Sequence, residues 1–594
     1  MTPDPHMTPD PRTTPDPRTT PDPRTTPDPR TTPDPRTTSG PAAGPVAGQD
    51  LVAAARAWLL QDPDPETRAE LSALLDSGDS AALLDRFGRK LEFGTAGLRG
   101  ELGAGPNRMN RVTVMRAAAG LAAVLGPGRH VVIGYDARHN SDVFARDTAA
   151  VLTGAGLHAS ILPCPLPTPV LAFSVLHLEA DAGVMVTASH NPPRDNGYKV
   201  YWGDGSQITP PIDSEISAAI DAVGRVDELP LGSPGTLTEL GEDIVDDYID
   251  AITALPLGDA RALRVAYTPL HGVGGGTLTD AFLRAGFESP MAVEEQRNPD
   301  PGFPTVAFPN PEEPGAMDLA SALAARTGAD LVLANDPDAD RCAVGVPLPG
   351  GSVRMLTGDE VGGLLAEHVI THTTGDRMVA TTIVSSTLLG KIARAHGVRY
   401  GETLTGFKWI IKAGPGLVFG YEEAIGYSVG SGAGLPVRDK DGIGAALTVA
   451  AIAAAARRDG RTLLDLLDDQ ARRYGLHATA QLSARVDDLS LIAGAMARLR
   501  ADPPATLGGR TVERADDLSR GDGGLPPTDG LRYTLSGGAR VVVRPSGTEP
   551  KLKCYLEVVV PVTDDVPAAR TEASHALEAL KSDLTKALDL ARHA

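Results

Sequence analysis

The stretch Ala182-Gly183-Val184-Met185-Val186-Thr187-Ala188-Ser189-His190-Asn191-Pro192 decides how the fold is interpreted. Its first five residues form a short uninterrupted apolar run, which is typical of a strand buried on both faces of a parallel sheet. A serine follows the run, and ligand sites in open α/β sheets form at the carboxyl ends of the strands. Because a lone serine there usually only caps a helix or closes a turn, its role depends on the rest of the chain.

Strand-like and helix-like patterns alternate around this stretch from about residue 90 onward. Further apolar runs of strand length occur at residues 130–135, 264–267 and 330–334. This alternation predicts repeated βαβ units and mainly parallel sheets. The last part of the chain contains a strand-like run at 553–560 and then a helical pattern, which indicates a smaller α+β domain.

The length of 594 residues fits roughly four domains. We expect an α/β protein with three α/β domains of mixed, mainly parallel sheets and a C-terminal α+β domain. Residues 49–89 show helical spacing of leucines and should form amphipathic helices. The expected division is 49–250 for these helices and the first domain, 251–362 for the second, 363–475 for the third and 476–594 for the fourth.

The first 36 residues are six copies of a hexapeptide close to Thr-Thr-Pro-Asp-Pro-Arg. Two prolines in every hexapeptide remove backbone donors and prevent a helix, while aspartate and arginine cancel in charge. We therefore expect residues 1–48 to be a disordered tail.

The composition argues against several classes of protein. A net charge of −21 argues against binding to nucleic acid or to an anionic membrane. The three cysteines are too few for a disulfide framework, and no signal peptide opens the chain, so we expect a cytoplasmic protein. The apolar run at 445–456 is too short to cross a bilayer and is expected to be a buried helix. Composition does not decide between a monomer and a dimer.

An acidic cluster is the second chemical signal. Asp336, Asp338 and Asp340 alternate, so in an extended segment their carboxylates would point to one side. Three like charges need a neutralising cation, and oxygen ligands suit Mg²⁺ or Ca²⁺. A calcium-binding EF-hand loop would require glycine and glutamate where this chain has Arg341 and Pro347, so that alternative fails.

A basic loop near the C-terminus is the third signal. The segment Arg544-Pro545-Ser546-Gly547-Thr548-Glu549-Pro550-Lys551 combines a glycine for a tight turn with two hydroxyls and two cationic side chains. Backbone amides, hydroxyls and a guanidinium suit a phosphate group. A nucleophile, a carboxylate cluster and an anion-binding loop together predict phosphoryl transfer.

A glycine-rich segment offers a competing interpretation. Gly272-Val273-Gly274-Gly275-Gly276 lies between a predicted strand and a predicted helix, as in dinucleotide-binding proteins. The third glycine of that fingerprint would fall at Thr277, so we do not favour a nicotinamide-dependent enzyme.

Taken together, the segments resemble the α-D-phosphohexomutase superfamily over residues 90–565. The resemblance comprises an N-terminal active-site loop (93–100), the phosphoserine loop (187–192), the metal loop (336–341), the sugar-recognition loop (420–426) and the phosphate loop (544–551). It implies four domains around one central cleft. It also implies a mutase of the isomerase class that needs Mg²⁺ and is activated by a sugar 1,6-bisphosphate.

Residue roles follow from this resemblance. Ser189 would rest as phosphoserine, and Mg²⁺ would be bound by Ser189 with Asp336, Asp338 and Asp340. Arg99 and Arg341 would stabilise the transferring group, with Lys199 the first and His190 the second candidate for proton transfer. The residues expected to bind the phosphosugar are Glu422, Arg438, Lys440, Arg544, Ser546, Gly547, Thr548 and Lys551.

The preferred sugar is less clearly defined. Many relatives carry a serine where this chain has Ala424 in the sugar-recognition loop, so one hydroxyl contact is missing. The segments 93–100, 404–409 and 422–426 resemble the phosphoglucomutase/phosphopentomutase-like branch. Glucose phosphate is the first expected substrate, with mannose or pentose phosphate as alternatives. A bisphosphate synthase or a non-catalytic phosphosugar-binding protein is a more distant alternative.

Overall fold

The computed structural model describes residues 48–94, 97–232, 236–486, 489–521, 524–546, 551–563 and 565–588. The predicted disordered tail, except for its last residue, lies outside the described residues. In the described part of the chain, every helix is too short or too polar to span a bilayer.

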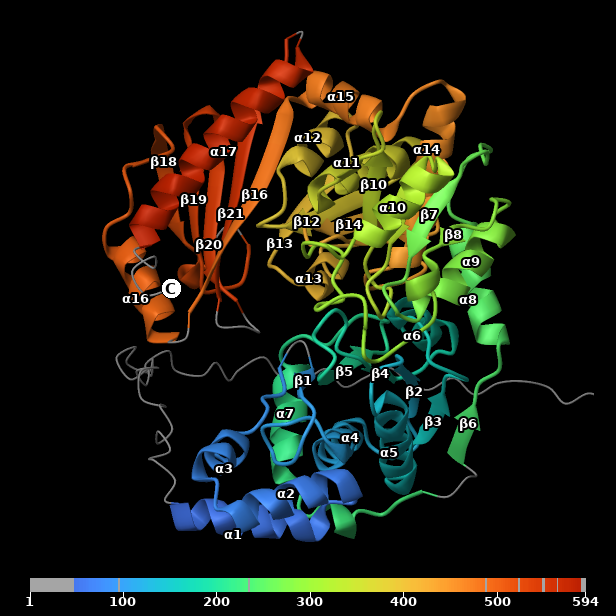
Figure 1. The fold of residues 1–594 in the computed structure, drawn as a ribbon, viewed down its shortest axis with the longest axis vertical. Helices are drawn as coiled ribbons and strands as arrows, with labels where there is room; N and C mark the ends of the chain where they lie inside the picture. Colours follow the sequence, from blue (N-terminus) through green and yellow to red (C-terminus); the bar gives the residue numbers. More distant parts are fainter. Residues whose placement is uncertain are drawn as a thin grey trace, which may run out of the picture. The chain divides into compact units, whose positions relative to one another are not determined.

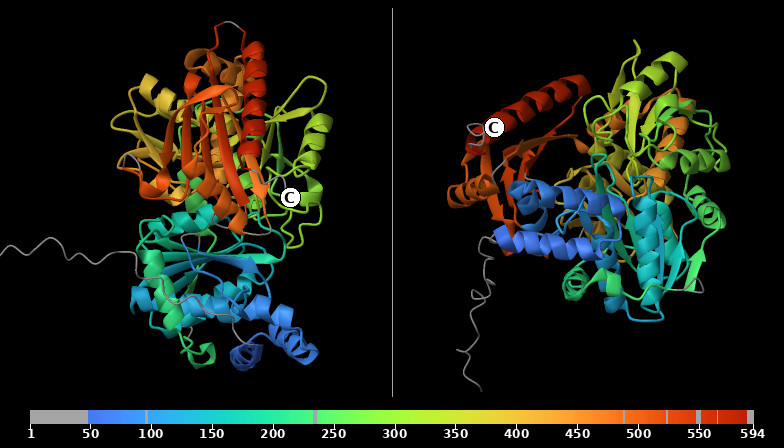
Figure 2. Two further views of the ribbon diagram at one scale, coloured as in Figure 1. Left: turned by 90° about the vertical axis from the view of Figure 1, so that its left-hand side faces the viewer. Right: turned by 60° about the horizontal axis from the view of Figure 1, so that its bottom comes forward.

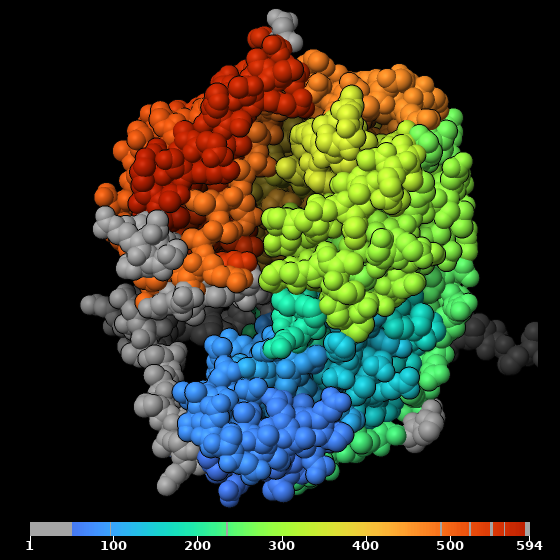
Figure 3. All heavy atoms as spheres, in the orientation of Figure 1, coloured from blue at the N-terminus to red at the C-terminus, as the bar shows by residue number. Residues whose placement is uncertain are grey.

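Three N-terminal helices cover one side of the first domain: α1 (Gly48–Gln61), α2 (Pro65–Ser77) and α3 (Ser80–Phe87). The Asp64 and Asp79 side chains cap α2 and α3 by accepting hydrogen bonds from backbone amides, which satisfies donors that a helix start leaves free. Trp58, Leu71 and Leu83 are buried in a cluster that includes residues of α4 (Arg111–Leu125). The three helices form the blue surface in Figure 3, next to the rest of the first domain.

The first domain is built on a six-stranded sheet in the order β1-β5-β4-β2-β3-β6. Strands β2, β3, β4 and β6 run parallel, whereas β5 is antiparallel to both β4 and β1. The strands are β1 (Leu98–Glu101), β2 (His130–Tyr135), β3 (His158–Ile161), β4 (Ala182–Val186), β5 (Asp195–Trp202) and β6 (Leu237–Glu239). Its helices are α4, α5 (Ser141–Gly154), α6 (Thr168–His177) and α7 (Ile212–Ala222).

The second domain has a five-stranded mixed sheet in the order β11-β10-β9-β7-β8. These strands are β7 (Val265–Thr268), β8 (Met291–Ala292), β9 (Leu331–Ala334), β10 (Ala343–Pro347) and β11 (Val353–Met355). Its helices are α8 (Asp243–Thr253), α9 (Gly274–Arg284) and α10 (Asp318–Thr327). The domain boundary expected at 250/251 falls inside α8, so the limits of that helix are the better place to divide the chain.

The third domain has a four-stranded mixed sheet in the order β13-β12-β14-β15. Its elements are α11 (Gly358–His372), β12 (Met378–Thr382), α12 (Leu388–Ala395), β13 (Arg399–Thr403), α13 (Phe407–Ile411), β14 (Leu417–Glu422), β15 (Gly426–Val429), α14 (Gly442–Arg458) and α15 (Leu463–Tyr474). The boundary expected at 362/363 falls inside α11. Helix α14 is buried along most of its length, which confirms the buried helix predicted at 445–456.

The fourth domain is an antiparallel sheet in the order β16-β21-β20-β19-β18-β17. Its elements are β16 (Leu476–Arg485), α16 (Leu489–Ala501), β17 (Thr506–Leu507), β18 (Arg510–Asp517), β19 (Leu531–Leu535), β20 (Arg540–Pro545), β21 (Lys551–Val560) and α17 (Val566–Leu588). Both ribbon views show α17 running along this sheet (Figures 1 and 2), and its buried leucines share a core with the strands. Three mixed sheets followed by an antiparallel one confirm the predicted fold class.

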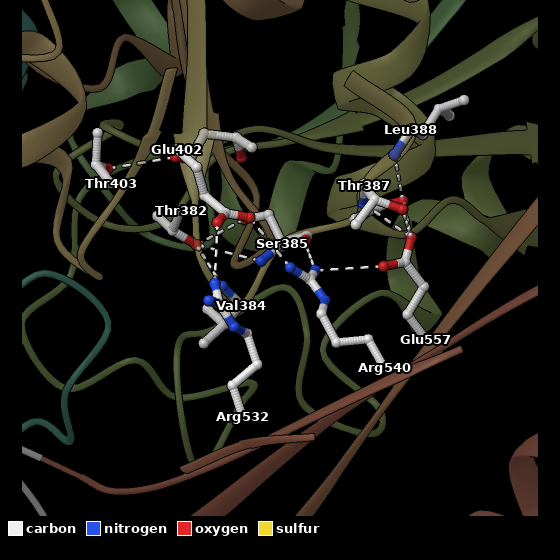
Figure 4. A network of polar contacts seen from close by, with 12 residues as sticks. Thr382, Val384, Ser385, Thr387, Leu388, Glu402, Thr403, Arg532, Arg540 and Glu557 are labelled. Carbon is white, nitrogen blue, oxygen red and sulfur yellow. Dashed lines mark hydrogen bonds and ion pairs between the residues drawn. The ribbon is translucent and has the colours of Figure 1, made fainter. Parts of the chain in front are cut away.

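The third and fourth domains meet through a small apolar cluster and a buried polar network. The apolar cluster includes Val384 of the third domain and Val542 of the fourth. In the network, Arg540 pairs with Glu402 of β13 and with Glu557 of β21 (Figure 4). Glu557 also accepts hydrogen bonds from residues 386 and 387 of the third domain. These contacts hold the fourth domain, with the predicted phosphate loop, against the third domain, with the predicted sugar-recognition loop.

Candidate active site

The serine predicted as nucleophile is buried at the carboxyl end of β4. Ser189 has a left-handed backbone (φ 52°), a conformation that is strained for a residue other than glycine. Its amide donates to Thr187 Oγ1 at 2.9 Å. Its hydroxyl donates to Asp336 Oδ2 at 2.8 Å and lies 3.2 Å from His190 Nδ1. The nucleophile therefore contacts both a predicted metal ligand and a candidate base.

The three aspartates converge, although not in the way the alternation suggested. They follow β9 in a tight turn that includes Ala339 with a left-handed φ of 54°, so the prediction of an extended segment was wrong. Oxygen atoms of Asp336, Asp338 and Asp340 nevertheless lie within 4.8 Å of one another, and all three residues are fully buried. The turn, rather than strand alternation, brings the carboxylates together.

This cluster fits a divalent cation. Asp338 Oδ1 and Asp340 Oδ1 are buried, and neither makes a hydrogen bond with the described part of the chain, although Arg341 Nε lies 3.7 Å from Asp340 Oδ1. A buried carboxylate oxygen without a hydrogen bond is costly unless a cation binds it. An oxygen-only set of ligands beside a serine hydroxyl suits Mg²⁺.

Cationic side chains from three domains surround the cluster. Lys199 Nζ of β5 lies 2.8 Å from Asp338 Oδ2 and 3.1 Å from Asp340 Oδ2. Lys440 Nζ lies 3.2 Å from Asp340 Oδ2. Burial raises the pKa of Asp336, and the neighbouring carboxylates raise it further. For Asp338, burial also raises the pKa but the nearby Lys199 outweighs it, so the pKa lies well below its ordinary value.

Arg341 links the metal loop to the sugar-recognition loop. Its Nη1 donates to the Ala424 carbonyl at 3.2 Å, and its Nη2 lies 3.9 Å from Glu422 Oε1. Its Nε lies 3.9 Å from Asp336 Oδ2, so one guanidinium contacts both loops. Glu422 is also 3.9 Å from the Lys440 ammonium group. Glu422, Lys440 and Arg341 thus lie together, whereas Arg438 is exposed.

Two further predicted site residues, Arg99 and His190, lie at the serine loop. Arg99 of β1 donates from Nη1 to Asn191 Oδ1 at 3.0 Å, which connects the N-terminal loop to the serine loop. Burial lowers the pKa of His190 well below its ordinary value, and the nearby Arg341 and Arg99 lower it further. Neutral histidine is therefore the favoured form of this side chain.

Only the base of the predicted phosphate loop is described. Arg544 is the penultimate residue of strand β20, and the Ser546 amide donates to the Lys551 carbonyl at 2.8 Å. Gly547 and Thr548 lie outside the described residues. The hairpin between β20 and β21 therefore holds the two ends of the loop together.

Sequence reasoning missed the role of the glycine-rich segment. A Cβ atom on Gly272 would lie 2.4 Å from the Pro337 Cα atom of the metal loop, and the Val273 amide donates to the Pro337 carbonyl at 2.9 Å. A Cβ on Gly274 would lie 2.8 Å from Ala339 Cβ. These glycines allow the start of α9 to pack against the metal loop. The sequence shows that glycines are concentrated at 272–276, but it does not show that they pack against the metal loop.

Sequence reasoning also missed Asp136 and Arg138, which follow β2. The carboxyl ends of β2 and β4 are adjacent because these strands pair in parallel. The motif Gly134-Tyr135-Asp136-Ala137-Arg138 was visible as polar residues directly after a predicted strand.

Comparison with known proteins agrees with this geometry. Four descriptions of one family match in succession: Phosphoglucomutase/phosphomannomutase alpha/beta/alpha domain I (90–226), domain II (246–348), domain III (357–474) and C-terminal domain (484–562). The "Probable phosphomannomutase" of Haemophilus influenzae is 45% identical, with 76% of this chain and 93% of that protein aligned. The mouse phosphopentomutase is 35% identical over 86% of this chain and 90% of that protein.

A solved structure shares the fold. The Phosphoglucomutase/phosphomannomutase family protein from Burkholderia thailandensis superposes with a TM-score of 0.62 at 21% identity, covering 84% of this chain and 97% of that one. The fold and site thus define an isomerase-class phosphotransferase of the phosphosugar mutase type. The chain belongs to the phosphoglucomutase/phosphomannomutase family, within the α-D-phosphohexomutase superfamily.

Proposed function

We propose that the chain interconverts glucose 1-phosphate and glucose 6-phosphate, with Ser189 carrying the phosphoryl group between the two half-reactions. The hydrogen bond of 2.8 Å from Ser189 Oγ to Asp336 Oδ2 is the observation that carries this proposal. It places the hydroxyl beside a buried carboxylate cluster, in a site from which burial excludes bulk water.

Charge neutralisation is the main task of the surrounding residues, because phosphoryl transfer depends mostly on positioning and electrostatics. Asp336, Asp338 and Asp340 would hold Mg²⁺ together with a phosphorylated Ser189. When bound, Mg²⁺ would supply Lewis-acid stabilisation of charge on the transferring group. Arg341 is well placed to add to this stabilisation because it lies between the metal loop and Glu422.

Proton transfer is assigned by position. Lys199 Nζ lies 2.8 Å from Asp338 Oδ2 in the carboxylate cluster, and His190 Nδ1 lies 3.2 Å from the serine hydroxyl. A general acid or base must come within hydrogen-bond reach of the sugar hydroxyl, a condition that the His190 contact with Ser189 supports and that Lys199 would meet through a hydroxyl bound beside the aspartates. We keep these two as the candidates for proton transfer. Arg99, which donates to Asn191 of the serine loop, is proposed with Arg341 to stabilise the transferring group.

Substrate binding is assigned to the loops of the third and fourth domains. Glu422 and Lys440 would contact sugar hydroxyls, with Arg438 at the rim. The phosphate of the substrate would bind to Arg544, Ser546, Gly547, Thr548 and Lys551. The two phosphates of the bisphosphate intermediate must bind at this site in turn. The site should therefore bind a phosphate group without specific contacts to the sugar ring. A sugar 1,6-bisphosphate would act as the activator that phosphorylates Ser189.

A pentose phosphate is the second candidate substrate. It is favoured by the 35% identity to mouse phosphopentomutase and by the missing hydroxyl at Ala424. A matched rate panel with Mg²⁺ and a trace of sugar bisphosphate tests the proposal. Glucose, mannose and ribose 1-phosphates are each followed to the terminal-phosphate isomer. A dominant glucose rate supports the proposal, a dominant ribose or mannose rate corrects the sugar, and no isomerisation of any of the three overturns it.

A further inference from the structure

Arg138 is a buried cation whose contacts concentrate on the backbone of the serine loop. Its Nη2 donates to the carbonyl oxygens of Ser189 and Asn191, each at 2.6 Å. Its Nη1 donates to the carbonyls of Pro192 and Asp195 at 2.8 and 3.1 Å. One side chain thus satisfies four carbonyls within seven consecutive residues, and only 4% of it is exposed.

The serine loop needs such support because its backbone is strained at the nucleophile. The φ of 52° at Ser189 is a left-handed conformation that costs about 1 kcal/mol or more in a residue with a Cβ atom. Such a conformation persists only where the surroundings enforce it. Arg138 binds the carbonyl of the strained residue itself and the three carbonyls that determine the path of the chain after it.

Arg138 is itself held by residues from two domains. Its Nε lies 3.5 Å from Asp136 Oδ2, and both atoms are buried. On its other side, the ring of Phe303 lies 5.0 Å from the guanidinium carbon, which is within cation–π distance. Phe303 is buried, has a left-handed φ of 45°, and belongs to the second domain.

The loop that carries Phe303 is tied to the support of the metal loop. The Phe303 amide donates to the Asp300 carbonyl, and the Asp300 amide donates to the His271 carbonyl at 3.0 Å. His271 directly precedes Gly272, which packs against Pro337 of the metal loop. A short series of contacts therefore runs from the metal loop through Phe303 and Arg138 to the backbone of Ser189.

We infer that Arg138 is a positioning residue for Ser189, and that Phe303 couples this positioning to the domain that carries the three aspartates. The inference rests on the proposed function of Ser189, but its structural part does not depend on turnover. The side-chain contacts of Arg138 described above are with Asp136, Phe303 and the carbonyls of the serine loop. Arg138 would therefore act on Ser189 through the loop backbone and not by contact with a reacting atom.

Two variants test the inference against a matched control. Arg138→Lys keeps the charge but replaces a planar fork with one ammonium group, which cannot reach four carbonyls at once. Phe303→Leu keeps an apolar side chain but removes the ring. The control is Arg111→Lys, which breaks a paired contact with Asp147 (two bonds of 2.7 Å) in the same domain, away from the serine loop.

The first readout is hydrogen exchange of residues 187–195 in the protein without substrate or bisphosphate. We expect faster amide exchange in this segment for Arg138→Lys, a smaller increase for Phe303→Leu and no change for the control. The second readout is steady-state kinetics with the best sugar phosphate. For Arg138→Lys we expect kcat to fall on the order of 10- to 100-fold, the scale of a misplaced reacting group, with KM within about twofold. For Phe303→Leu we expect a loss of about threefold.

The outcomes distinguish a failure of the positioning role of Arg138 from a failure of the proposed mutase function. Unchanged exchange in Arg138→Lys, or an unchanged kcat in an active protein, would overturn the positioning role. An equal loss of kcat in the Arg111→Lys control would indicate a general effect on stability and would also overturn it. If the wild-type protein isomerises no sugar phosphate, the proposed function fails, while the exchange result still decides whether Arg138 orders the loop.

Discussion

Ser189 donates a hydrogen bond of 2.8 Å to Asp336, although 147 residues separate them in the chain. The serine comes from the first domain and the aspartate from the second. The acceptor oxygen belongs to a buried cluster in which, among the described residues, Asp338 Oδ1 and Asp340 Oδ1 have no hydrogen-bond partner. Ser189, the proposed nucleophile, is therefore placed next to a cluster that could hold a cation.

Replacing the nucleophile should remove turnover altogether. Ser189→Ala deletes the hydroxyl that would carry the phosphoryl group and that donates to Asp336. We expect no isomerisation above background, and no phosphate on this protein by intact mass after incubation with a sugar bisphosphate. Retained activity in Ser189→Ala would exclude the phosphoserine mechanism.

Weakening the acidic cluster should raise the Mg²⁺ requirement. Asp340→Asn removes one charge from the set, and even residues that only support metal ligands change affinity about 10- to 100-fold. We expect the Mg²⁺ concentration for half-maximal activity to rise at least tenfold, and a chelator to abolish wild-type activity until Mg²⁺ is restored. The control is Asp376→Asn, whose side chain is 80% exposed. Equal Mg²⁺ curves for Asp340→Asn and wild type would contradict the metal assignment.

Removing Lys199 should destabilise the protein by leaving buried negative charge. Lys199 pairs with Asp338 and Asp340, and deleting one partner of a buried pair costs about 3–5 kcal/mol. We expect Lys199→Met to lower the urea midpoint in the presence of chelator. Adding Asp338→Asn to it should recover part of the loss, because the uncompensated charge is then removed. A double variant less stable than Lys199→Met would show that the pair is not the cause.

The glycine beside the metal loop should not tolerate a side chain. Gly272→Ala would place a methyl group 2.4 Å from the Pro337 Cα atom and 2.5 Å from its carbonyl oxygen. We expect a loss of about 1–3 kcal/mol in stability and a weaker apparent Mg²⁺ affinity, because the metal loop must shift. Gly276→Ala, in the first turn of the helix α9 that follows, is the control, since no atom lies within 4 Å of its Cβ position. That variant should be neutral or slightly more stable, and equal effects of the two variants would refute the packing argument.

The polar network between the third and fourth domains should make the protein less stable at acid pH. Burial alone would raise the pKa of Glu557, but Arg540 and His477 outweigh it and lower the pKa to about 2 (Figure 4). Because this pKa lies below the unfolded value of 4.5, the stabilisation is present above about pH 4.5 and is lost as pH falls toward 2. Each unit of pKa difference corresponds to about 1.4 kcal/mol, so the contribution of Glu557 to the free energy of unfolding is at most about 3 kcal/mol.

Glu557→Gln should therefore lower the melting temperature at pH 7 and have a smaller effect near pH 3. Thermal melts across this pH range measure the difference. The control is Glu578→Gln, since the side chain of Glu578 is 68% exposed and its ion pair should contribute little. A melting difference between Glu557→Gln and wild type that does not change with pH would contradict the assignment.

Much of the fold and part of the site could be predicted from sequence, because they depend on local patterns. The apolar run before Ser189, the runs at 130–135 and 330–334, and the buried helix at 445–456 all obey burial periodicity over a few residues. The identities of Ser189 and the three aspartates were equally visible, since nucleophiles and metal ligands are recognised by residue type. Their order in the chain also indicated the class of enzyme.

The tertiary structure alone decided how these segments support one another. The turn at Ala339, the packing of Gly272 on Pro337 and the contact of Arg138 with Phe303 depend on which loops meet, often between domains. The sequence shows residue types but not these partners, because close approach and hydrogen-bond geometry are set by the packing of distant segments. Sequence therefore determined which groups carry the chemistry, and packing determined how each one is held in place.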